Sequence, residues 1–559
     1  MRLTNHLQDA QTLEDNISTG TASRSTRRRL LGCSVVLWIG FLAWSAAFVA
    51  RTSVELESGE TYFCLFDDAM ISMRYAWNIA HGLGPVWNPS ERVEGYTNPL
   101  QVLLMVPANA FLPRRYASLA VQVLGFLLVV ATAVAARSWG LQLMRDLGPW
   151  HGELVGLVAF IAQAATLAYY PLAYWSLMGM EVGLVTLLVL LGIVVSVRVP
   201  TVGRALALGL LAAAGYLTRP DALVLFFPMA VAFLLGIRRL EGGRLRLLVS
   251  LIVPGGLVLA GHFLWRQSYY GEWLPNTYVL KVGGIPLADR VANGIAYLSP
   301  FLAEHSLLLL LTLYGCLAMR TLAARVSAGV AACAIAYQVW AGGDPWWYWR
   351  LLTPAAVLML LVAVASLAHL ARQLYVRLEG RSRNEVLRPS RHGLGQGMFV
   401  VGGCLALLLS CNWRFRNEIR LWQRPFGVDA SETNTRIGVA LAAVLRPEAK
   451  VAVFAAGIIP YFCERYAVDL LGKCDKRIAR LEPDLVHVSH GPLKYLPGHN
   501  KYALNGTFLR YSPDFVQWAN WGAESLRPEI TNRLVPFRLG GYLVSDSPYV
   551  NWAGAVDSP

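Results

Sequence analysis

The sequence predicts a polytopic α-helical membrane domain followed by a small α/β domain, and three observations indicate this. Apolar residues make up 55% of the 559 residues and charged residues only 15%, whereas soluble proteins carry about 25% charge. Apolar segments long enough to enter a bilayer recur between residues 30 and 411. Residues 412–559 contain no such segment and show short strand-like runs separated by glycine and proline turns.

The first apolar segment, residues 30–50, sets the orientation of the chain. It directly follows a basic group, Arg24, Arg27, Arg28 and Arg29. Positive charge at the start of a span holds that end in the cytoplasm. We therefore expect residues 1–29 to form a cytoplasmic, disordered tail and residues 51–113 to form the first outer loop. The segment is too long to be a cleaved signal peptide, and many more apolar segments follow it.

The later apolar segments can be placed on alternating sides of the membrane. About eleven spans are predicted, forming a transmembrane domain over residues 30–411. The segments are residues 30–50, 114–136, 152–170, 182–197, 205–217, 222–237, 247–264, 301–319, 326–341, 351–370 and 397–411. Residues 99–112 are apolar but short, which favours a helix lying in the interface. Counting them as a span would invert every later loop.

The positive-inside rule opposes that inversion. The most basic loop would then lie outside, although this rule places arginine-rich loops in the cytoplasm. The arginines of this loop are Arg372, Arg377, Arg381, Arg383, Arg388 and Arg391. The net charge of +14 is thus explained by topology, and we expect membrane lipids but no nucleic acid as partners. The longest of the later outer loops is expected at residues 265–300.

The C-terminal domain, residues 412–559, is expected on the outer side of the membrane. Strand-like runs occur at residues 450–455, 467–471 and 484–489. Cys463 and Cys474 could pair there if the compartment is oxidising. No cysteine and histidine spacing resembles a zinc site.

Asp67 and Asp68 are the most informative polar residues, because they follow the first span on the outer side. A sugar hydroxyl that attacks an anomeric carbon needs a general base, which a carboxylate supplies. A lipid-phosphate leaving group needs nearby positive charge as it departs. The structural alternative is that Asp67 only caps the helix expected at residues 69–80, a role that aspartate fills well. The spacing alone leaves both interpretations open.

The other polar clusters also fall on the predicted outer side. Glu181 could simply end a span, and Arg219 with Asp221 could form a local ion pair at a helix break. Aromatic residues near the interface are often anchors, and a loop histidine is usually on the surface. Lys281 could bind phosphate as a point charge. The residues in question are Glu181, Arg219, Asp221, Tyr270, Asn276, Lys281, Asp344, Arg350 and His499.

Several of these stretches together resemble a known family. Residues 66–76, 87–89 and 91–99 are similar to the first outer loop of the C-type (GT-C) glycosyltransferases, most of all the terminal β-arabinofuranosyltransferases of the mycobacterial cell wall and their relatives. Further stretches of this sequence resemble later landmarks of that group, in the same order. They are residues 179–181, 218–221, 269–271, 275–278, 342–344, 459–461, 469–472, 478–480 and 497–499. The resemblance covers about residues 60–515. One departure is residues 472–475, which are more cationic than the family pattern.

The resemblance implies a transferase that uses a polyprenyl-phosphate sugar, often arabinofuranose, and inverts the anomeric carbon. An outer-face glycan or glycoprotein of the cell envelope would be the acceptor, and the enzyme would lie in a bacterial inner membrane. Asp67 or Asp68 would be the catalytic base. A divalent cation near these aspartates and Glu181 is an open possibility. Residues of the matching stretches and outer clusters are the substrate-binding candidates: Arg74, Glu91, Arg92, Glu94, Tyr96, Glu181, Arg219, Asp221, Tyr270, Asn276, Lys281, Asp344, Arg350 and His499.

Two other functions remain open from the sequence. A transporter or flippase of lipid-linked sugars would place polar residues within broken spans near the midplane, whereas the polar groups here gather outside. A non-catalytic glycan-binding or assembly protein would use the outer domain. That function predicts that changes at Asp67 and Asp68 are harmless.

Overall fold

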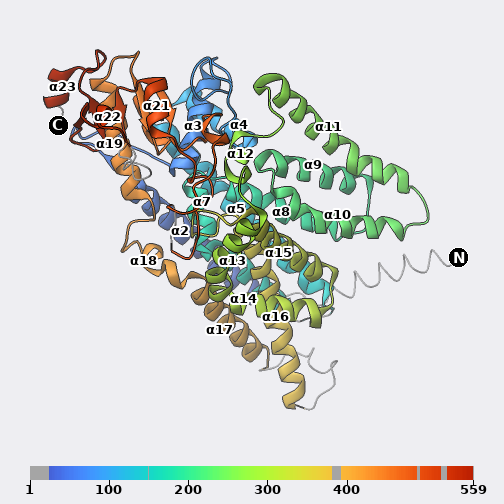
Figure 1. The fold of residues 1–559 in the computed structure, drawn as a ribbon. Coiled ribbons are helices and arrows are strands. Elements are labelled where there is room, and N and C mark those ends of the chain that lie inside the picture. Colours follow the sequence, from blue (N-terminus) through green and yellow to red (C-terminus); the bar gives the residue numbers. More distant parts are fainter. Residues whose placement is uncertain are drawn as a thin grey trace.

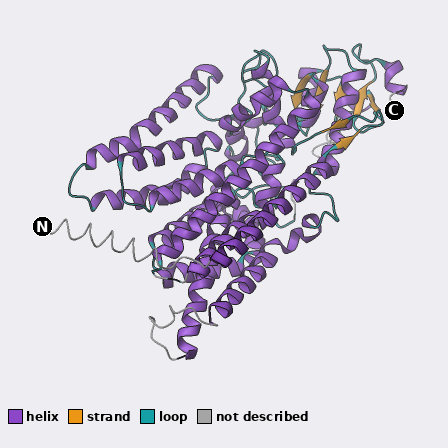
Figure 2. Ribbon diagram, turned by 180° about the vertical axis from the view of Figure 1, so that it is seen from behind, coloured by secondary structure: helices purple, strands orange, loops and turns teal. Residues whose placement is uncertain are grey.

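A computed structural model describes residues 24–148, 150, 152–379, 392–487, 491–517 and 526–557. The described chain is mostly helical, with one small sheet near its C-terminal end (Figure 1). Figure 2 shows the strands gathered at one corner of the molecule, while helices form the rest. Of the predicted tail, residues 1–23 lie outside the described residues, and α2 already begins at Arg24.

Each of the eleven predicted segments contains a helix, because their side chains are apolar on all sides. These helices are α2 (Arg24–Thr52), α5 (Arg114–Asp146), α6 (Gly152–Ala168), α8 (Val182–Ser196), α9 (Val202–Thr218), α10 (Ala222–Arg238), α11 (Arg244–Tyr270), α14 (Ser306–Tyr314), α15 (Leu322–Ala341), α16 (Thr353–Glu379) and α17 (His392–Asn412). The π-helical η2 (Gly315–Met319) continues α14.

Length and composition decide which helices could cross a membrane. In the described part of the chain, six helices are long and apolar enough, and the count rises to eight if two bent pairs are each one span. The bent pairs are α6 with α7 (Tyr170–Leu177), at 51°, and α13 (Leu287–Glu304) with α14, at 78°. Helices α8, α9 and α10 are shorter, and so is α4 (Pro99–Phe111), the helix predicted to lie in the interface. The exact number of spans stays a prediction.

The segment predicted as an outer loop, residues 265–300, is largely helical. Helix α11 continues to Tyr270, and α12 (Asn276–Val282) and α13 follow. Gly271 ends α11 in the left-handed conformation, at φ 71°. Of the basic loop, Arg381, Arg383, Arg388 and Arg391 lie outside the described residues.

Helix α16 forms the centre of the helical domain. Of its apolar 18-residue stretch, 89% is buried inside the protein. The helix packs against α5, α6, α8, α14, α15 and α17. Helices α9, α10 and α11 extend to one side of this centre (Figure 1). Helix α9 approaches α11 closely at Gly209, where an added Cβ would overlap a backbone carbonyl of Leu251, and small residues permit such approaches.

The first loop connects the helical domain to the sheet domain. It contains a short antiparallel pair, β1 (Val54–Glu55) with β2 (Thr61–Tyr62), followed by α3 (Asp67–Ala80) and α4. Helix α3 packs against α4 on one side and against α20 (Ile458–Cys463) of the sheet domain on the other. Figure 1 shows α3 beside the C-terminal elements.

The sheet domain holds a mixed five-stranded sheet in the order β4-β3-β5-β7-β6. Strand β3 is parallel to β4 and β5, whereas β7 is antiparallel to β5 and β6. The strands are β3 (Lys450–Val453), β4 (Tyr466–Asp469), β5 (Phe515–Val516), β6 (Leu534–Pro536) and β7 (Tyr542–Val544). The first two predicted runs are therefore strands. The third is wrong over residues 484–487, which form no strand, and residues 488–490 lie outside the described residues.

The two faces of β3 join different cores. Val451 and Val453 belong to the core that continues into the helical domain, whereas Ala452 belongs to a second core beneath α21 (Leu504–Tyr511). This alternation follows from the two-residue period of a strand. One face of the sheet is thus fixed against α20 and the first loop. Further elements here are η4 (Trp413–Phe415), α18 (Arg416–Ile419), α19 (Val428–Val444), η5 (Ile478–Arg480), α22 (Pro528–Thr531) and α23 (Trp552–Asp557).

The eight cysteines are all free thiols. Cys463 and Cys474 are buried in the sheet domain and do not pair. The pairing that the sequence left open is therefore absent.

Candidate functional site

Asp67 begins α3 but does not cap it. Phe66 is the N-cap, and no side chain caps this helix end. The Asp67 carboxylate instead accepts hydrogen bonds from the backbone N–H groups of Ile458, at 2.9 Å, and Gly457, at 3.2 Å. Burial raises the pKa of Asp67 to about 6, against the lowering effect of nearby Lys473. Asp67 therefore ties α3 to the start of α20.

Asp68 lies between two cations. Its Oδ1 accepts a hydrogen bond from Lys473 Nζ at 2.7 Å, and its Oδ2 accepts one from Arg350 at 3.0 Å. The indole N–H of Trp346 also donates to Oδ2, at 3.2 Å. Burial alone would raise the pKa of Asp68, but Lys473 and Arg350 offset this and hold the pKa well below its usual range. Asp68 is thus ionised at neutral pH.

Arg350 is held in place by Asp344. Its Nε and one terminal nitrogen donate to the two oxygens of Asp344, each at 2.8 Å, and both side chains are buried. A bidentate pair of this kind fixes the plane of the guanidinium group. The turn between α15 and α16 supports it, since Gly343 has φ 82° and an added Cβ there would lie 2.6 Å from Tyr297 Cβ. The remaining nitrogen of Arg350 is directed to Asp68.

Lys281, on α12, carries an amine that makes no hydrogen bond or ion pair with any described residue. It lies within electrostatic range of Asp68, Arg350 and Arg219. Burial, together with the positive charge of Arg350, lowers its pKa to about 8. Gly498, at φ 77°, approaches the stem of this side chain, because an added Cβ would lie 3.3 Å from Cε. Lys281 is thus a cation held without a partner among the residues that the structure describes.

Arg219 completes the positive charge around Lys281. It binds Asp221 through two nitrogens, at 2.9 and 3.2 Å, and Glu181 at 2.5 Å. Glu181 also accepts a hydrogen bond from Asn98 at 3.1 Å. Arg219, Lys281 and Arg350 come from three separate segments, and we call them the cationic cluster.

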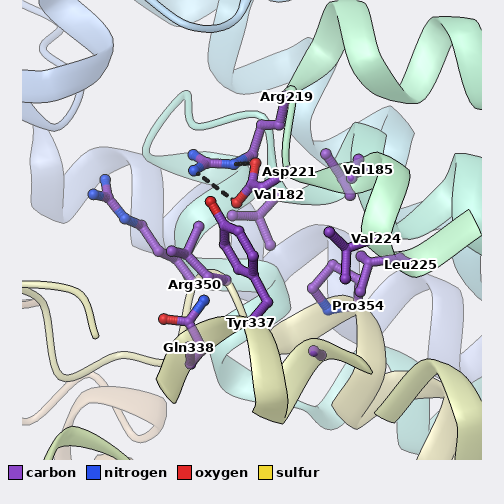
Figure 3. Close-up of a pocket in the computed structure, with 13 residues that line it drawn as sticks. Val182, Val185, Arg219, Asp221, Val224, Leu225, Tyr337, Gln338, Arg350 and Pro354 are labelled. Carbon is purple, nitrogen blue, oxygen red and sulfur yellow. Dashed lines mark hydrogen bonds and ion pairs between the residues drawn. The ribbon is translucent and has the colours of Figure 1, made fainter. Parts of the chain in front are cut away.

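An apolar pocket begins at the two arginines of the cationic cluster. It is a partly open space of about 400 Å³, counting the part exposed to solvent, between α8, α10, α15 and the start of α16. Figure 3 shows Arg219 and Arg350 on one side of the pocket and valine and leucine side chains on the other. Its lining includes Val185, Arg219, Ala334, Tyr337, Arg350 and Leu351. The pocket therefore has one charged end and an apolar body.

His499 lies on the sheet-domain side of Asp68. Its ring packs edge to face against Trp346, with centroids 5.7 Å apart. Burial lowers its pKa to about 3, and the positive charge of Lys473 acts in the same direction. His499 is therefore a neutral group beside Asp68.

The other predicted residues lie where the first loop meets its neighbours. Arg74 donates to the backbone carbonyls of Trp87, Pro460 and Arg465. Glu94 pairs with Arg266 at 2.6 Å. These contacts join the first loop to the sheet domain and to α11.

Five further candidates make contacts of the same kind. Tyr96 and Tyr270 share a hydrogen bond at 3.1 Å, Glu91 accepts one from Tyr466, and the Arg92 guanidinium lies 4.7 Å from the centroid of the Tyr269 ring. Asn276 donates to the carbonyls of Gly472, at 2.8 Å, and Lys473, at 2.9 Å. Asn276 thus fixes the loop that carries Lys473.

Lys473 is the main residue of the site that sequence reasoning missed. The one signal in the sequence was that residues 472–475 are more cationic than the family pattern. Nothing in the sequence indicated that this loop reaches across to α3, since Lys473 is 405 positions away from Asp68 in the chain.

A carboxylate set suitable for a divalent cation is not assembled. Among the described residues, no group of three or more histidine, cysteine, aspartate or glutamate side chains could hold a metal ion. The residues present therefore do not fit the cation that the sequence left open near Asp67, Asp68 and Glu181.

Comparisons with known proteins place the fold. A family model described as a domain of unknown function (DUF8728) matches residues 418–536. No curated protein matches the chain. The apo structure of ArnT from Cupriavidus metallidurans has a TM-score of 0.50, at 13% identity, over 92% of this chain and 98% of that chain.

Two other solved structures were also matched. ArnT bound to undecaprenyl phosphate gives a TM-score of 0.49 at 13% identity, over 78% of this chain and 85% of that chain. The oligosaccharyltransferase AglB from Archaeoglobus fulgidus, in complex with an inhibitory peptide and a dolichol-phosphate, gives 0.41 at 11% identity, over 78% and 65%. The likeness to apo ArnT confirms the predicted fold class, and at this identity it shows the fold alone.

Proposed function

We propose that this protein is a membrane glycosyltransferase that moves a sugar from a polyprenyl-phosphate donor to an acceptor hydroxyl. The observation that carries the proposal is the position of Arg350. This residue binds the Asp68 carboxylate at 3.0 Å and also lines the mouth of the apolar pocket. A base and a phosphate site are thereby adjacent, as a group transfer from a lipid phosphate requires.

The donor fits the pocket by its two-part chemistry. The prenyl tail would enter between α8, α10 and α15, where the lining is apolar, and the phosphate would lie at the cationic cluster. Lys281 offers an amine that has no partner in the described part of the chain, and charge-assisted hydrogen bonds to phosphate are among the strong ones. ArnT, which shares the fold, has been solved with undecaprenyl phosphate, and this suggests the class of lipid.

Asp68 is the better candidate for the base. The pKa of Asp67 lies closer to neutrality, but its carboxylate is directed to the backbone of Gly457 and Ile458. Geometry decides before pKa, since a base must reach the proton that it removes. Asp68 accepts three hydrogen bonds, and an ionised carboxylate has about four acceptor positions. One position remains for an acceptor hydroxyl, and Asp67 acts as a positioning residue.

The reaction balances as a single displacement with inversion. The acceptor oxygen attacks the anomeric carbon, and its proton passes to Asp68. The bond between that carbon and the phosphate oxygen breaks, and the electron pair leaves with the polyprenyl phosphate. Lys281 and Arg350 stabilise the negative charge that develops on this leaving group.

The proposed sugar, acceptor and location follow from the sequence resemblance. Arabinofuranose is the proposed sugar, and a cell-envelope glycan or a glycoprotein is the proposed acceptor. The proposed location is a bacterial inner membrane, with the sheet domain and the site on its outer face. Tag accessibility in the loop near Arg381 tests this orientation, since the loop would then lie in the cytoplasm.

Transfer by the purified protein tests the proposed function. Full-length protein in lipid nanodiscs is incubated with radiolabelled polyprenyl-phosphate arabinofuranose and envelope glycan, and the product is separated from the lipid. We expect transfer by wild type and a loss of about 10²–10⁴-fold in Asp68→Asn, the usual range for removal of a general base. Exposed Asp429 provides a matched control, since Asp429→Asn should transfer normally. Undiminished transfer by Asp68→Asn would remove the assignment of the base.

Flipping of a lipid-linked sugar is the second candidate, and one observation favours it. The two bent helix pairs meet, because Tyr169, at the break between α6 and α7, contacts His305, between α13 and α14, at 3.2 Å. Broken helices of this kind line the binding sites of transporters. Flipping of a fluorescent polyprenyl-phosphate sugar without any transferred product would support this function over the transferase.

A further inference from the structure

We infer that Lys473 takes the place of a divalent cation at Asp68, so that the sheet domain itself supplies the counter-charge of the site. The inference concerns the proposed active site, but its central measurement, metal binding, does not need transferase activity. It rests on the contacts of the three carboxylates that a cation would need.

Each of these carboxylates already accepts hydrogen bonds from protein groups on both of its oxygens. Both oxygens of Asp68 are bound by cationic side chains, Lys473 and Arg350. Asp67 faces backbone N–H groups of the sheet domain. Glu181 is bound by Arg219 through one oxygen and by Asn98 through the other. A divalent ion would have to displace these donors and lie next to two like charges.

The position of Lys473 is fixed by its own loop. Asp469 accepts hydrogen bonds from the backbone N–H groups of Leu471, Gly472 and Cys474, the last at 2.6 Å. Gly472 has φ 80°, and an added Cβ there would meet Ile478 and Ala479 within 3 Å. Asn276, from the helical domain, binds the carbonyls of Gly472 and Lys473. The backbone is therefore held on both sides of Lys473.

The amine is also in a suitable environment to remain charged. Lys473 is only 8% exposed, and a buried ammonium group is stable only when it is paired. Asp68 accepts its hydrogen bond, and Asp67 adds negative charge nearby. Lys473 thus acts on Asp68 as a bound cation would, with a tether to the sheet domain. Lys473 is therefore a positioning residue, because Asp68, and not Lys473, would contact the substrate.

Manganese binding to the full-length protein tests the inference directly. Mn²⁺ is titrated into wild type and Asp68→Asn in nanodiscs and followed by electron paramagnetic resonance. We expect no saturable binding that depends on Asp68. Saturable binding by wild type that Asp68→Asn abolishes would overturn the inference, whether or not the protein transfers sugar.

Transfer measurements examine the role of Lys473 itself. We expect wild-type transfer after chelation to stay within about twofold of its initial rate, and Lys473→Gln to lose kcat by about 10²-fold with little change in donor KM. Lys473→Arg should recover most of kcat, and Lys476→Gln, three residues away, should resemble wild type. Normal kcat in Lys473→Gln would overturn the inference, as would activity lost on chelation and restored by Mn²⁺. If Lys473→Gln fails to fold, the wild-type chelation result decides.

Discussion

The backbone of Asp67 lies directly against Gly457, where the sheet domain meets α3. A Cβ added to Gly457 would overlap the carbonyl oxygen of Asp67, while the N–H of Gly457 donates to the side chain of the same residue at 3.2 Å. The two segments are therefore joined by a contact that only glycine permits. Lys473, from the same sheet domain, reaches the neighbouring Asp68 at 2.7 Å.

Gly457→Ala should separate α3 from α20. We expect a loss of roughly 1–3 kcal/mol of stability, as for other overpacked sites, together with reduced transfer, because Lys473 would move with the sheet domain. Thermal unfolding of the purified variant and a transfer assay measure the two effects. Gly256→Ala is the matched control, since an added Cβ there meets nothing within 4 Å. Equal stability of both variants would show that the contact is not tight.

The pKa of Asp67 predicts a pH-dependent contribution to stability. Because the folded pKa is raised to about 6, the contribution is full below the unfolded value, about 3.9, and is lost as the pH rises through 6. The unfolding temperature of wild type relative to Asp67→Asn should therefore fall between pH 4 and pH 7, by the equivalent of roughly 2 kcal/mol. Thermal scans of both proteins across this range measure it. A difference that stays constant with pH would contradict the assignment.

Lys281 predicts an alkaline limit on donor use. With a pKa of about 8, its amine loses its charge above that pH, and kcat/KM for the donor should fall there because this parameter reports the free enzyme. Lys281→Arg should extend the profile to higher pH, since arginine stays charged. Below that pH, Lys281→Gln should be about 10–100-fold lower than wild type, the usual worth of a charged hydrogen bond. An identical alkaline limb in wild type and Lys281→Arg would exclude Lys281 from phosphate binding.

The sequence was sufficient to predict the helices and several residues of the site. Apolar composition alone locates a helix that must bury its backbone in lipid, and all eleven segments are helical. Asp68, Lys281, Asp344 and Arg350 were each candidates from the outer loops, and the structure brings them together. The positive-inside rule placed these loops on one side of the membrane, and residues on the same side can come together in space.

The remaining features depend on contacts between distant segments. Lys473 and Gly457 belong to the sheet domain, and no local pattern shows that their loops reach α3. Arg74 and Glu94 seemed suited to bind substrate because they are charged residues in a motif-like loop. Their partners in the structure are carbonyls and Arg266. A charged residue that is buried to join two segments has the same local sequence as one that binds a ligand.

Filling the pocket tests where the prenyl tail lies. Val185 and Ala334 line its apolar body, so Ala334→Phe should occupy space that the donor needs while leaving Asp68 and the cationic cluster intact. We expect kcat/KM for the polyprenyl donor to fall by about 10–100-fold, or about 1.4–2.7 kcal/mol of transition-state binding, mainly through KM. Leu257→Phe, at a position 68% exposed on α11, is the matched control and should leave KM unchanged. A short-chain donor provides the second arm, since it has little tail to displace and should be affected less by Ala334→Phe. If both donors lose the same activity, the pocket does not bind the tail.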